Sequence, residues 1–426
     1  MKLLITNAQV IDPFGGYEGA ATILIEDGTI KSVAKNGKIK NHAGARVIDA
    51  AGMYVAPAFT DMHTHLREPG FEHKETIRTG TLAALKGGFA TVCCMPNTNP
   101  VNDNPGTTEY ILKKAAGEGS ARVLPIGAIT KGQRGEELAE MEMMLKAGCI
   151  AFSDDGRPVE SPIIMRRALE YAKGLGTTII SHAEDLQLSS GGVMNEGLLS
   201  MTLGLKGSPS IAEEVMVFRD IALCGLTGGK LHIAHVSTKG SVDIIRRAKE
   251  QGIHVTAETC PHYFSITEEA VTGYNTNAKV NPPLRRPEDV EAIKDGLRDG
   301  VIDVIATDHA PHGKEEKTRE FDAAPSGISG LETVLPLGLA LVQGKTLSMM
   351  ELIRKLTVNP AGILGIEAGG ISEGREAHIC IFHPEKEYEF RAGEMFSKGK
   401  NSPFDGWKLK GKTAWTILGE KVHEWA

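Results

Sequence analysis

The feature that most constrains the fold is a regular alternation of short apolar runs and longer amphipathic runs, beginning near residue 57. The apolar runs predict buried strands, because a parallel strand covered on both faces lacks polar alternation. Eight strands are expected, ending near His63, Met95, Ala128, Ser153, His182, Val236, Thr259 and Asp308. Repeated strand–helix units of this number favour a parallel (β/α)8 barrel of the TIM type, with its active site at the carboxyl ends of the strands.

The amphipathic runs predict the helices of this barrel. They span Thr76–Lys86, Thr107–Ala116, Glu136–Ala147, Ile163–Lys173, Ser210–Cys224, Gly240–Gln251, Pro287–Asp299 and, last, Ser348–Leu356.

Both ends of the chain show the shorter alternation that is typical of β-strands. The expected strands are Lys2–Ala8, Ala21–Glu26, Thr29–Ala34, Arg46–Asp49, His378–His383, Glu387–Phe390 and Thr413–Leu418. Asp27-Gly28 predicts a hairpin between two of them. We therefore predict an α/β protein in which residues 1–56 and 365–426 form one small β-sandwich domain around a barrel of residues 57–364.

Composition restricts the classes of function. The formal charge of −7 comes without a basic tract, which argues against nucleic acid or an anionic membrane as the main partner. No apolar run approaches the roughly 20 residues that cross a bilayer, and the N-terminus turns polar too early for a secretory signal. The six cysteines stand mostly in apolar contexts, so we expect them reduced in a cytoplasmic protein. The role of Cys260, near a predicted strand end, stays open.

The run Asp61-Met-His-Thr-His-Leu-Arg-Glu-Pro-Gly70 is the strongest functional signal. It follows an apolar stretch, residues 53–59, that predicts a buried strand. Alternate side chains of a strand share a face, so His63 and His65 are expected to converge, with Arg67 following. Two imidazoles suit a zinc ion, and a guanidinium suits a substrate carboxylate. Taken alone, the pair could also be two surface histidines near a loop.

Other expected strand ends carry further polar groups. Asn97 follows the second strand, His182 the fifth and Asp308 the eighth, and a buried cluster of this kind is costly without a partner such as a metal. Only one of His232 and His235 can point inward, and we choose His235 because it lies closer to the carboxyl end. Asp154 and Asp155 are left as alternatives. His254, His262 and His309 stay ambiguous, whereas the histidines expected outside the site are His42, His73, His378, His383 and His423.

These motifs, with Met95-Pro-Asn-Thr98, Phe152-Ser-Asp-Asp-Gly156, Asn281-Pro-Pro-Leu-Arg285 and Ala306-Thr-Asp-His-Ala-Pro-His312, are similar to those of the class I bacterial dihydroorotases of the amidohydrolase superfamily. The resemblance runs essentially from end to end. It implies reversible, zinc-dependent cyclisation of N-carbamoyl-L-aspartate to dihydroorotate, the third step of pyrimidine (UMP) biosynthesis.

The resemblance also implies roles for individual residues. One or two zinc ions would be held, the first by His63, His65, Asp155 and Asp308, and the second by Asp155, His182 and His235, so that Asp155 bridges. Asp308 would be the catalytic acid and base. Substrate would be bound by His65, Arg67, Asn97, Asn281, His312, Ser326 and Gly327. Related proteins often have Phe where Ser326 stands, a change that a backbone contact would survive.

Two other functions are weighed against this reading. Hydantoinases and allantoinase usually carry a lysine on the fourth strand, and no lysine occurs between Gly148 and Pro158. A non-catalytic dihydroorotase-like subunit of aspartate transcarbamoylase would lack metal ligands, and every candidate ligand is present here. A homodimer and a transcarbamoylase partner both stay open. The charged run from Gly313 to Glu320 is either a solvated loop or a segment that closes over substrate.

Overall fold

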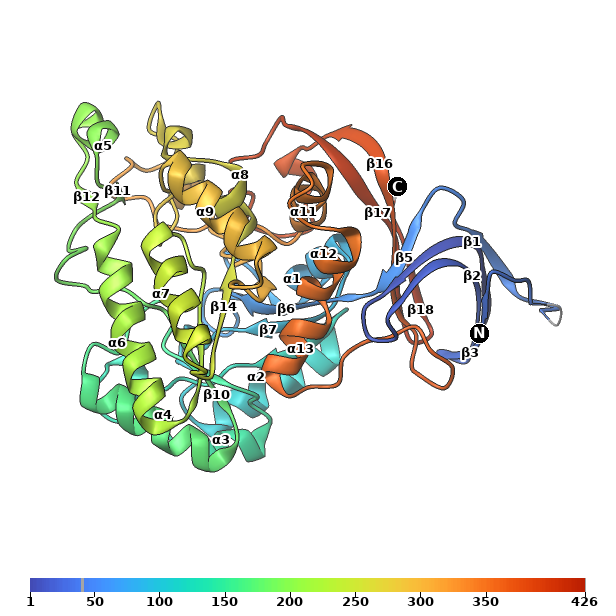
Figure 1. Ribbon diagram of the computed structural model, residues 1–426, viewed down its shortest axis with the longest axis horizontal. Coiled ribbons are helices and arrows are strands. Elements are labelled where there is room, and N and C mark those ends of the chain that lie inside the picture. The colour runs from blue at the N-terminus through green and yellow to red at the C-terminus, as the bar shows by residue number, and fades with distance from the viewer. Residues whose placement is uncertain (40–41, 426) are drawn as a thin grey trace.

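The computed structural model describes residues 1–39 and 42–425. The chain forms a barrel surrounded by helices, with a separate sheet beside it to which both termini contribute (Figure 1). This arrangement is the predicted α/β architecture.

Short parallel strands make the barrel, eight of them within the described residues. They are β6 (Phe59–Thr64), β7 (Phe89–Cys94), β8 (Arg122–Pro125), β9 (Phe152–Ser153), β10 (Thr178–Ser181), β13 (Lys230–Ile233), β14 (Val255–Thr259) and β15 (Val304–Ile305). Hydrogen bonds join β6-β7-β8 and β15-β14-β13-β10-β9. Parallel bridges between Gly127 and Phe152 and between Thr64 and His309 connect the two groups, so the barrel closes.

Helices cover the outside of the barrel (Figure 1). Those that match the predicted helices are α1 (Ile77–Gly87), α2 (Pro105–Glu118), α3 (Met141–Ala147), α4 (Pro162–Leu175), α6 (Ile211–Thr227), α7 (Lys239–Glu250), α9 (Pro287–Arg298) and α12 (Met349–Leu356). Further helices are α5 (Leu198–Leu203), α8 (Pro261–Ser265), α10 (Lys314–Lys317), α11 (Val334–Gln343) and α13 (Val358–Leu364).

Local sequence explains where α1 starts and stops. Thr76 precedes the helix, and its side chain accepts a hydrogen bond from the backbone N–H of Thr79, which would otherwise lack a partner. Gly88 ends the helix with φ of 93°, a left-handed conformation that glycine adopts without a Cβ penalty.

The predicted start of α3 at Glu136 is wrong. The helix begins at Met141, because the preceding segment turns back on itself. Thr130 and Leu138 form an antiparallel bridge, and the N–H of Lys131 donates to the carbonyl of Glu137. These contacts use the backbone groups that a longer helix would need.

The terminal sheet is mixed and contains eight strands within the described residues. They are β1 (Lys2–Asp12), β2 (Tyr17–Glu26), β3 (Thr29–Lys35), β4 (Arg46–Asp49), β5 (Tyr54–Pro57), β16 (His378–Glu389), β17 (Lys408–Leu418) and β18 (Lys421–Glu424). The order is β18-β17-β16-β5-β1-β2-β3, with β4 beside β1. The predicted union of both chain ends is therefore present, through antiparallel pairing of β16 with β5.

The apolar stretch 53–59 was predicted as one strand, and this is wrong. Its first part is β5 in the terminal sheet, and Phe59 starts β6 in the barrel. The break at Ala58 arises because its N–H donates to His378 of the terminal sheet, whereas the N–H of Phe59 donates to Gly88. The domain limits at residues 56/57 and 364/365 stay a prediction.

Three apolar clusters stabilise the molecule. The largest lies between strands and helices, a second fills the terminal sheet, and a third, which includes Met62, Ile180 and Val304, fills the barrel. Within the described residues, no helix is both long and apolar enough to span a membrane.

Candidate metal centre and active site

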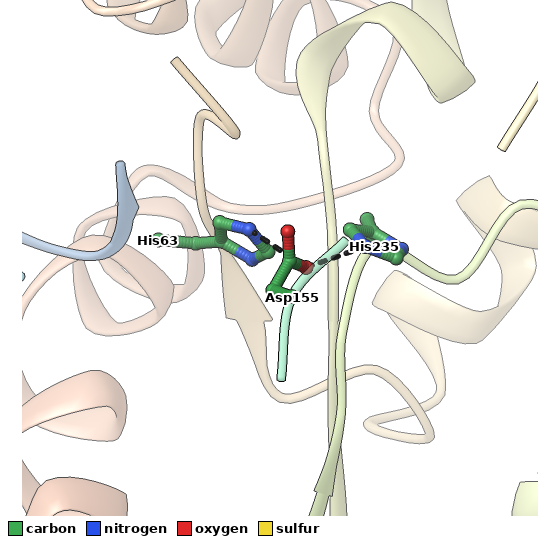
Figure 2. Close-up of side chains that lie close together, drawn as sticks. All are labelled: His63, Asp155 and His235. Atoms are coloured by element: carbon green, nitrogen blue, oxygen red, sulfur yellow. Dashed lines mark hydrogen bonds and ion pairs between the residues drawn. The ribbon is translucent and has the colours of Figure 1, made fainter. Parts of the chain in front are cut away.

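Side chains from five barrel strands meet at the carboxyl ends of the strands. They include all six predicted metal ligands: His63, His65, Asp155, His182, His235 and Asp308. Asp155 lies at their centre, and Figure 2 shows it between His63 and His235. Its Oδ2 is 3.3 Å from Nε2 of His63, 3.4 Å from Nδ1 of His182 and 3.1 Å from Nε2 of His235.

A second carboxylate approaches the same group from the opposite side of the barrel. Oδ1 of Asp308 is 3.0 Å from Nε2 of His65 and 3.5 Å from Nε2 of His63. Val304 and Ala306, which precede Asp308 in the chain, pack in the cluster that fills the barrel. His63 therefore points between two carboxylates.

In three of the four imidazoles, those of His63, His65 and His182, the nitrogen that faces away from the centre is held by an oxygen acceptor. Nδ1 of His63 lies 2.5 Å from Oε1 of Glu258, and Nδ1 of His65 lies 2.8 Å from Oδ1 of Asn97. Nε2 of His182 lies 3.1 Å from Oε2 of Glu184. An N–H that donates outward leaves the lone pair of the other nitrogen aimed at the centre, which is the usual arrangement of a metal-binding histidine.

A second observation indicates that these residues fit a divalent metal ion. Nε2 of His63 is buried and has no hydrogen-bond partner, a costly state for a polar atom. His63 belongs to two groups whose potential ligand atoms lie within 4.8 Å of one another, one with Asp155 and His235 and one with His65 and Asp308. A cation bound among these atoms would give the orphaned nitrogen a partner.

Electrostatics also favours positive charge at this centre. Burial alone would lower the pKa of His63, but the carboxylates of Asp155 and Glu258 outweigh burial and raise that pKa well above its ordinary value. Burial would likewise raise the pKa of Asp155, yet His63, His182 and His235 hold that pKa well below its ordinary value. Either protons on the imidazoles or a metal ion can supply the positive charge.

The structure separates the members of the two pairs that the sequence analysis weighed, Asp154 with Asp155 and His232 with His235. The carboxylate of Asp154 turns away and accepts hydrogen bonds from the backbone N–H groups of Ile129 and Thr130, so Asp155 is the residue at the centre. His235 points to the centre as expected. His232 lies beneath it, between Thr256 and Glu258.

Three of the site residues have left-handed backbone conformations that non-glycine residues rarely adopt. The φ angles are 63° at Arg67, 33° at His235 and 45° at Asp308. Such conformations cost free energy and cluster at functional sites, where the surrounding structure holds them.

A cavity of about 590 Å³ opens above the centre, a size typical of small-molecule sites. All seven residues predicted to contact substrate line it: His65, Arg67, Asn97, Asn281, His312, Ser326 and Gly327. A Cβ at Gly327 would come within 2.5 Å of the carbonyl oxygen of Ala310, so only glycine fits there.

Arg67 gives one wall of the cavity a positive charge. Arg67 is buried, which lowers its pKa to about 10, so it stays charged at neutral pH. Burial, Arg67 and Lys74 lower the pKa of His312 to about 2, so this imidazole is neutral. Lys74 then donates to Nδ1 of His312 at 3.3 Å, and Nε2–H of His312 donates to the carbonyl of Ser326 at 2.8 Å. A wall of this charge suits an anionic ligand.

Sequence reasoning missed Glu184, Glu258 and Lys74. Glu258 carried a usable signal, because an acidic side chain inside a barrel strand needs a buried partner. Glu184 links two predicted residues, accepting from His182 and from Nδ2 of Asn281 at 2.9 Å. Lys74 had no such signal, since it precedes α1 and reaches the site only through the fold.

The remaining histidines do not join the six ligands. His309 is buried against Glu75, and His254 lines a cavity at the amino ends of the strands. His262 lies close to Cys260 and Asp308. The histidines expected elsewhere, His42, His73, His378, His383 and His423, are not among the residues that line the cavity or form the metal-binding groups of the described chain, although His73 contacts Glu316 at 3.9 Å.

Comparison with known proteins agrees with this geometry. A family profile described as "Dihydro-orotase-like" matches residues 52–241. A protein of Geobacter sulfurreducens named Dihydroorotase is 55% identical over 99% of both chains. One of Syntrophus aciditrophicus with the same name is 51% identical over 99% of both.

Solved structures share the fold. The L-hydantoinase (dihydropyrimidinase) from Arthrobacter aurescens superposes with a TM-score of 0.87 at 25% identity, covering 99% of this chain and 95% of that one. The dihydropyrimidinase from Brevibacillus agri gives 0.85 at 23% identity, with coverage of 99% and 95%. These are barrel amidohydrolases with a β-sandwich domain. Relatives that share at least half of their residues along nearly the entire length show that the chain belongs to the dihydroorotase family, within the metal-dependent amidohydrolases.

Proposed function

We propose that the chain interconverts N-carbamoyl-L-aspartate and (S)-dihydroorotate plus water in the cavity at the carboxyl ends of the barrel strands. The observation that carries this proposal is the set of imidazoles whose outer nitrogens are held by Glu258, Asn97 and Glu184, next to the buried guanidinium of Arg67. The first feature suits a catalytic metal and the second a carboxylate of the substrate.

The proposed metal is zinc, which imidazole and carboxylate ligands suit. His63, His65, Asp155 and Asp308 would hold one ion, and Asp155, His182 and His235 a second. Bound zinc polarises a carbonyl oxygen and lowers the pKa of water. Asp155 has a shorter reach than a carboxylated lysine, so the second ion would be held more weakly than the first.

Arg67 and its neighbours orient the substrate. The Arg67 guanidinium would bind the free α-carboxylate, and Asn281 and the backbone at Ser326 would position the ring. Nε of Arg67 already donates to the carbonyl of Pro311 at 3.2 Å, which fixes the direction of the fork. The neutral His312 adds no further charge beside Arg67, and its Nε2–H would have to leave the carbonyl of Ser326 to donate to the substrate.

Asp308 moves the proton. In ring opening, water adds to the ring amide carbonyl, and the carboxylate of Asp308 takes one of its protons. Asp308 then gives this proton to the ring nitrogen as the carbon–nitrogen bond breaks. His65, at 3.0 Å, and His63 hold the pKa of Asp308 below its ordinary value despite burial, so the carboxylate starts the cycle ionised. Ring closure follows the same steps in reverse.

The two other functions are less well supported. Hydantoinases share the fold, but the acidic residue at the centre is Asp155, where those enzymes usually have a lysine, and Arg67 has no obvious partner on an uncharged ring. A silent scaffold subunit would not need the converging ligands.

Metal analysis and activity on one preparation test the proposal. We expect zinc in the purified protein, loss of dihydroorotate turnover after chelation, and recovery when zinc is added back. Hydantoin, dihydrouracil and allantoin serve as competing substrates. A metal-loaded sample that is inert toward both dihydroorotate and N-carbamoyl-L-aspartate would refute the proposal.

We also propose a homodimer in the cytoplasm. Large apolar side chains are exposed on α6, with Ile211 at 47%, Phe218 at 64% and Leu226 at 65%, as expected for a surface that a second copy covers. Light scattering should give twice the chain mass, and Phe218→Glu should give the monomer. Aspartate transcarbamoylase is the other proposed partner. If the two proteins bind, adding it should give a larger complex in size-exclusion chromatography.

A further inference from the structure

A third group of potential metal ligands lies behind Asp308. It consists of Cys260, His262 and Asp308, and one ligand atom from each lies within 4.8 Å of the other two. The parallel pairing of β14 with β15 brings the ends of these strands together. Cys260 directly follows β14, and Pro261 then starts the short helix α8, which carries His262.

This group is buried and partly unsatisfied. Cys260 and His262 are 0% and 1% exposed, and Cys260 is a free thiol. Nε2 of His262 is buried and has no hydrogen-bond partner. A buried polar nitrogen without a partner costs free energy, and the proposed reaction does not use it.

We propose that Cys260, His262 and Asp308 form an auxiliary site for a thiophilic divalent cation of the zinc class. Sulfur, imidazole and carboxylate together are a typical zinc donor set, with room for water at a fourth position. The catalytic centre contains no sulfur, so the two sites differ in chemistry. On binding, the Cys260 thiol loses its proton to solvent, and the thiolate sulfur bonds to the cation.

Because the site shares the carboxylate of Asp308, a cation bound there would inhibit turnover. This inference rests on the proposed function of Asp308. One oxygen of Asp308 would bind the catalytic ion, and a cation bound to Cys260, His262 and Asp308 would take the other oxygen, which is the one left to move the proton. Excess metal would therefore inhibit an enzyme that needs metal. Asp308 lines the cavity, which gives a cation a route to the buried site.

Cobalt titration tests the site without any assay of activity. A bond between thiolate and Co²⁺ gives an intense near-ultraviolet charge-transfer band, which imidazole and carboxylate ligands do not give. Within the described residues, Cys260 is the only cysteine in a potential metal-binding group. We expect the band in the wild type once the catalytic centre is filled, and its loss in Cys260→Ser.

Cys149→Ser is the matched control. Cys149 is equally buried but contacts Asn102 and Thr108, which a serine hydroxyl can replace. This variant should keep the band, and His262→Gln should weaken cobalt binding by about tenfold or more. Absence of the band in the wild type, its persistence in Cys260→Ser, or its equal loss in Cys149→Ser would overturn the proposal.

Zinc inhibition separates this inference from the proposed function. Wild-type turnover should rise and then fall as zinc is added, and the midpoint of the fall should move at least about tenfold higher in Cys260→Ser. If the band appears but zinc does not inhibit, the auxiliary site stands and its control of Asp308 is wrong. If no substrate turns over, the proposed function fails while the band still reports on the site.

Discussion

The two ends of the same barrel handle buried charge differently. At the amino ends of the strands, Asp303 is paired with Nζ of Lys249 at 2.6 Å, and Nζ of Lys355 donates to the carbonyl of Ile302. At the carboxyl ends, Asp155 and Asp308 face imidazoles, and the outer nitrogens of those imidazoles face further acceptors. One end satisfies its own charges, whereas the other is arranged to receive a cation. Buried carboxylates that face imidazoles rather than lysines thus distinguish the functional end.

The largest effect should come from replacing the carboxylate at the carboxyl end of β15, with the carboxylate at its amino end as the control. Asp308→Asn should lower kcat by about 10²- to 10⁴-fold, because the amide cannot move the proton. Asp303→Asn, just before the same strand, should leave kcat unchanged while it weakens the contact with Lys249. Steady-state kinetics and metal content of both variants provide the measurement. Similar losses in the two variants would remove the contrast between the ends.

Arg67→Ala should lower kcat/KM for dihydroorotate by a factor that corresponds to about 1.5–3 kcal/mol, the usual value of a hydrogen bond to a charged group. The metal content should stay that of the wild type, because Arg67 is not among the proposed ligands. Arg78→Ala, an exposed arginine on α1, is the control. Near-normal turnover in Arg67→Ala would contradict its role in binding the carboxylate.

Glu258→Gln should weaken metal binding or turnover by about 10- to 100-fold, because the amide no longer fixes the proton on Nδ1 of His63. Glu213→Gln is matched in burial, but Glu213 holds the backbone and hydroxyl groups of Ser237 and Thr238. That control should lower the melting temperature and leave metal affinity intact. Equal metal affinities in the two variants would mean that the outer acceptor of His63 is unimportant.

The smallest effect concerns pH and stability. His312 has a pKa lowered to about 2 by burial, Arg67 and Lys74, against an ordinary value of 6.5. Below about pH 6.5 the unfolded chain binds a proton that the folded chain does not. The free energy of unfolding therefore decreases as the pH is lowered, by up to about 1.4 kcal/mol per pH unit. His312→Gln lacks this penalty. When the pH is lowered from about 7 to about 5, the Tm of the wild type should therefore fall more than the Tm of the variant. Equal falls would argue against a neutral buried His312.

Much of this site could be predicted because barrel topology links sequence position to place. A residue at a strand end must lie at the rim, so His63, His182 and Asp308 could be grouped before any coordinates. Strand alternation could not separate Asp154 from Asp155, because both follow the end of β9, where regular alternation stops. The backbone contacts of Asp154 decide that pair.

The charged run after His312 shows a similar limit. Its composition suggested a solvated loop or a lid, yet Lys317 is buried and donates to the carbonyls of Thr276 and Pro325 at 2.8 Å each. Closure over substrate stays a prediction, and hydrogen exchange with and without ligand tests it. These two contacts would have to break or move with the segment.

The sequence by itself determined the strand–helix alternation, the β-type runs at both ends of the chain, and which residues reach the rim of the barrel. These follow from periodicity, which is a local property of the chain. Only the tertiary structure decided which imidazole nitrogen faces the centre, which contacts turn Asp154 away from it, and that Cys260 and His262 lie behind Asp308. Such choices depend on hydrogen bonds between segments far apart in the chain, and local sequence carries no record of those partners.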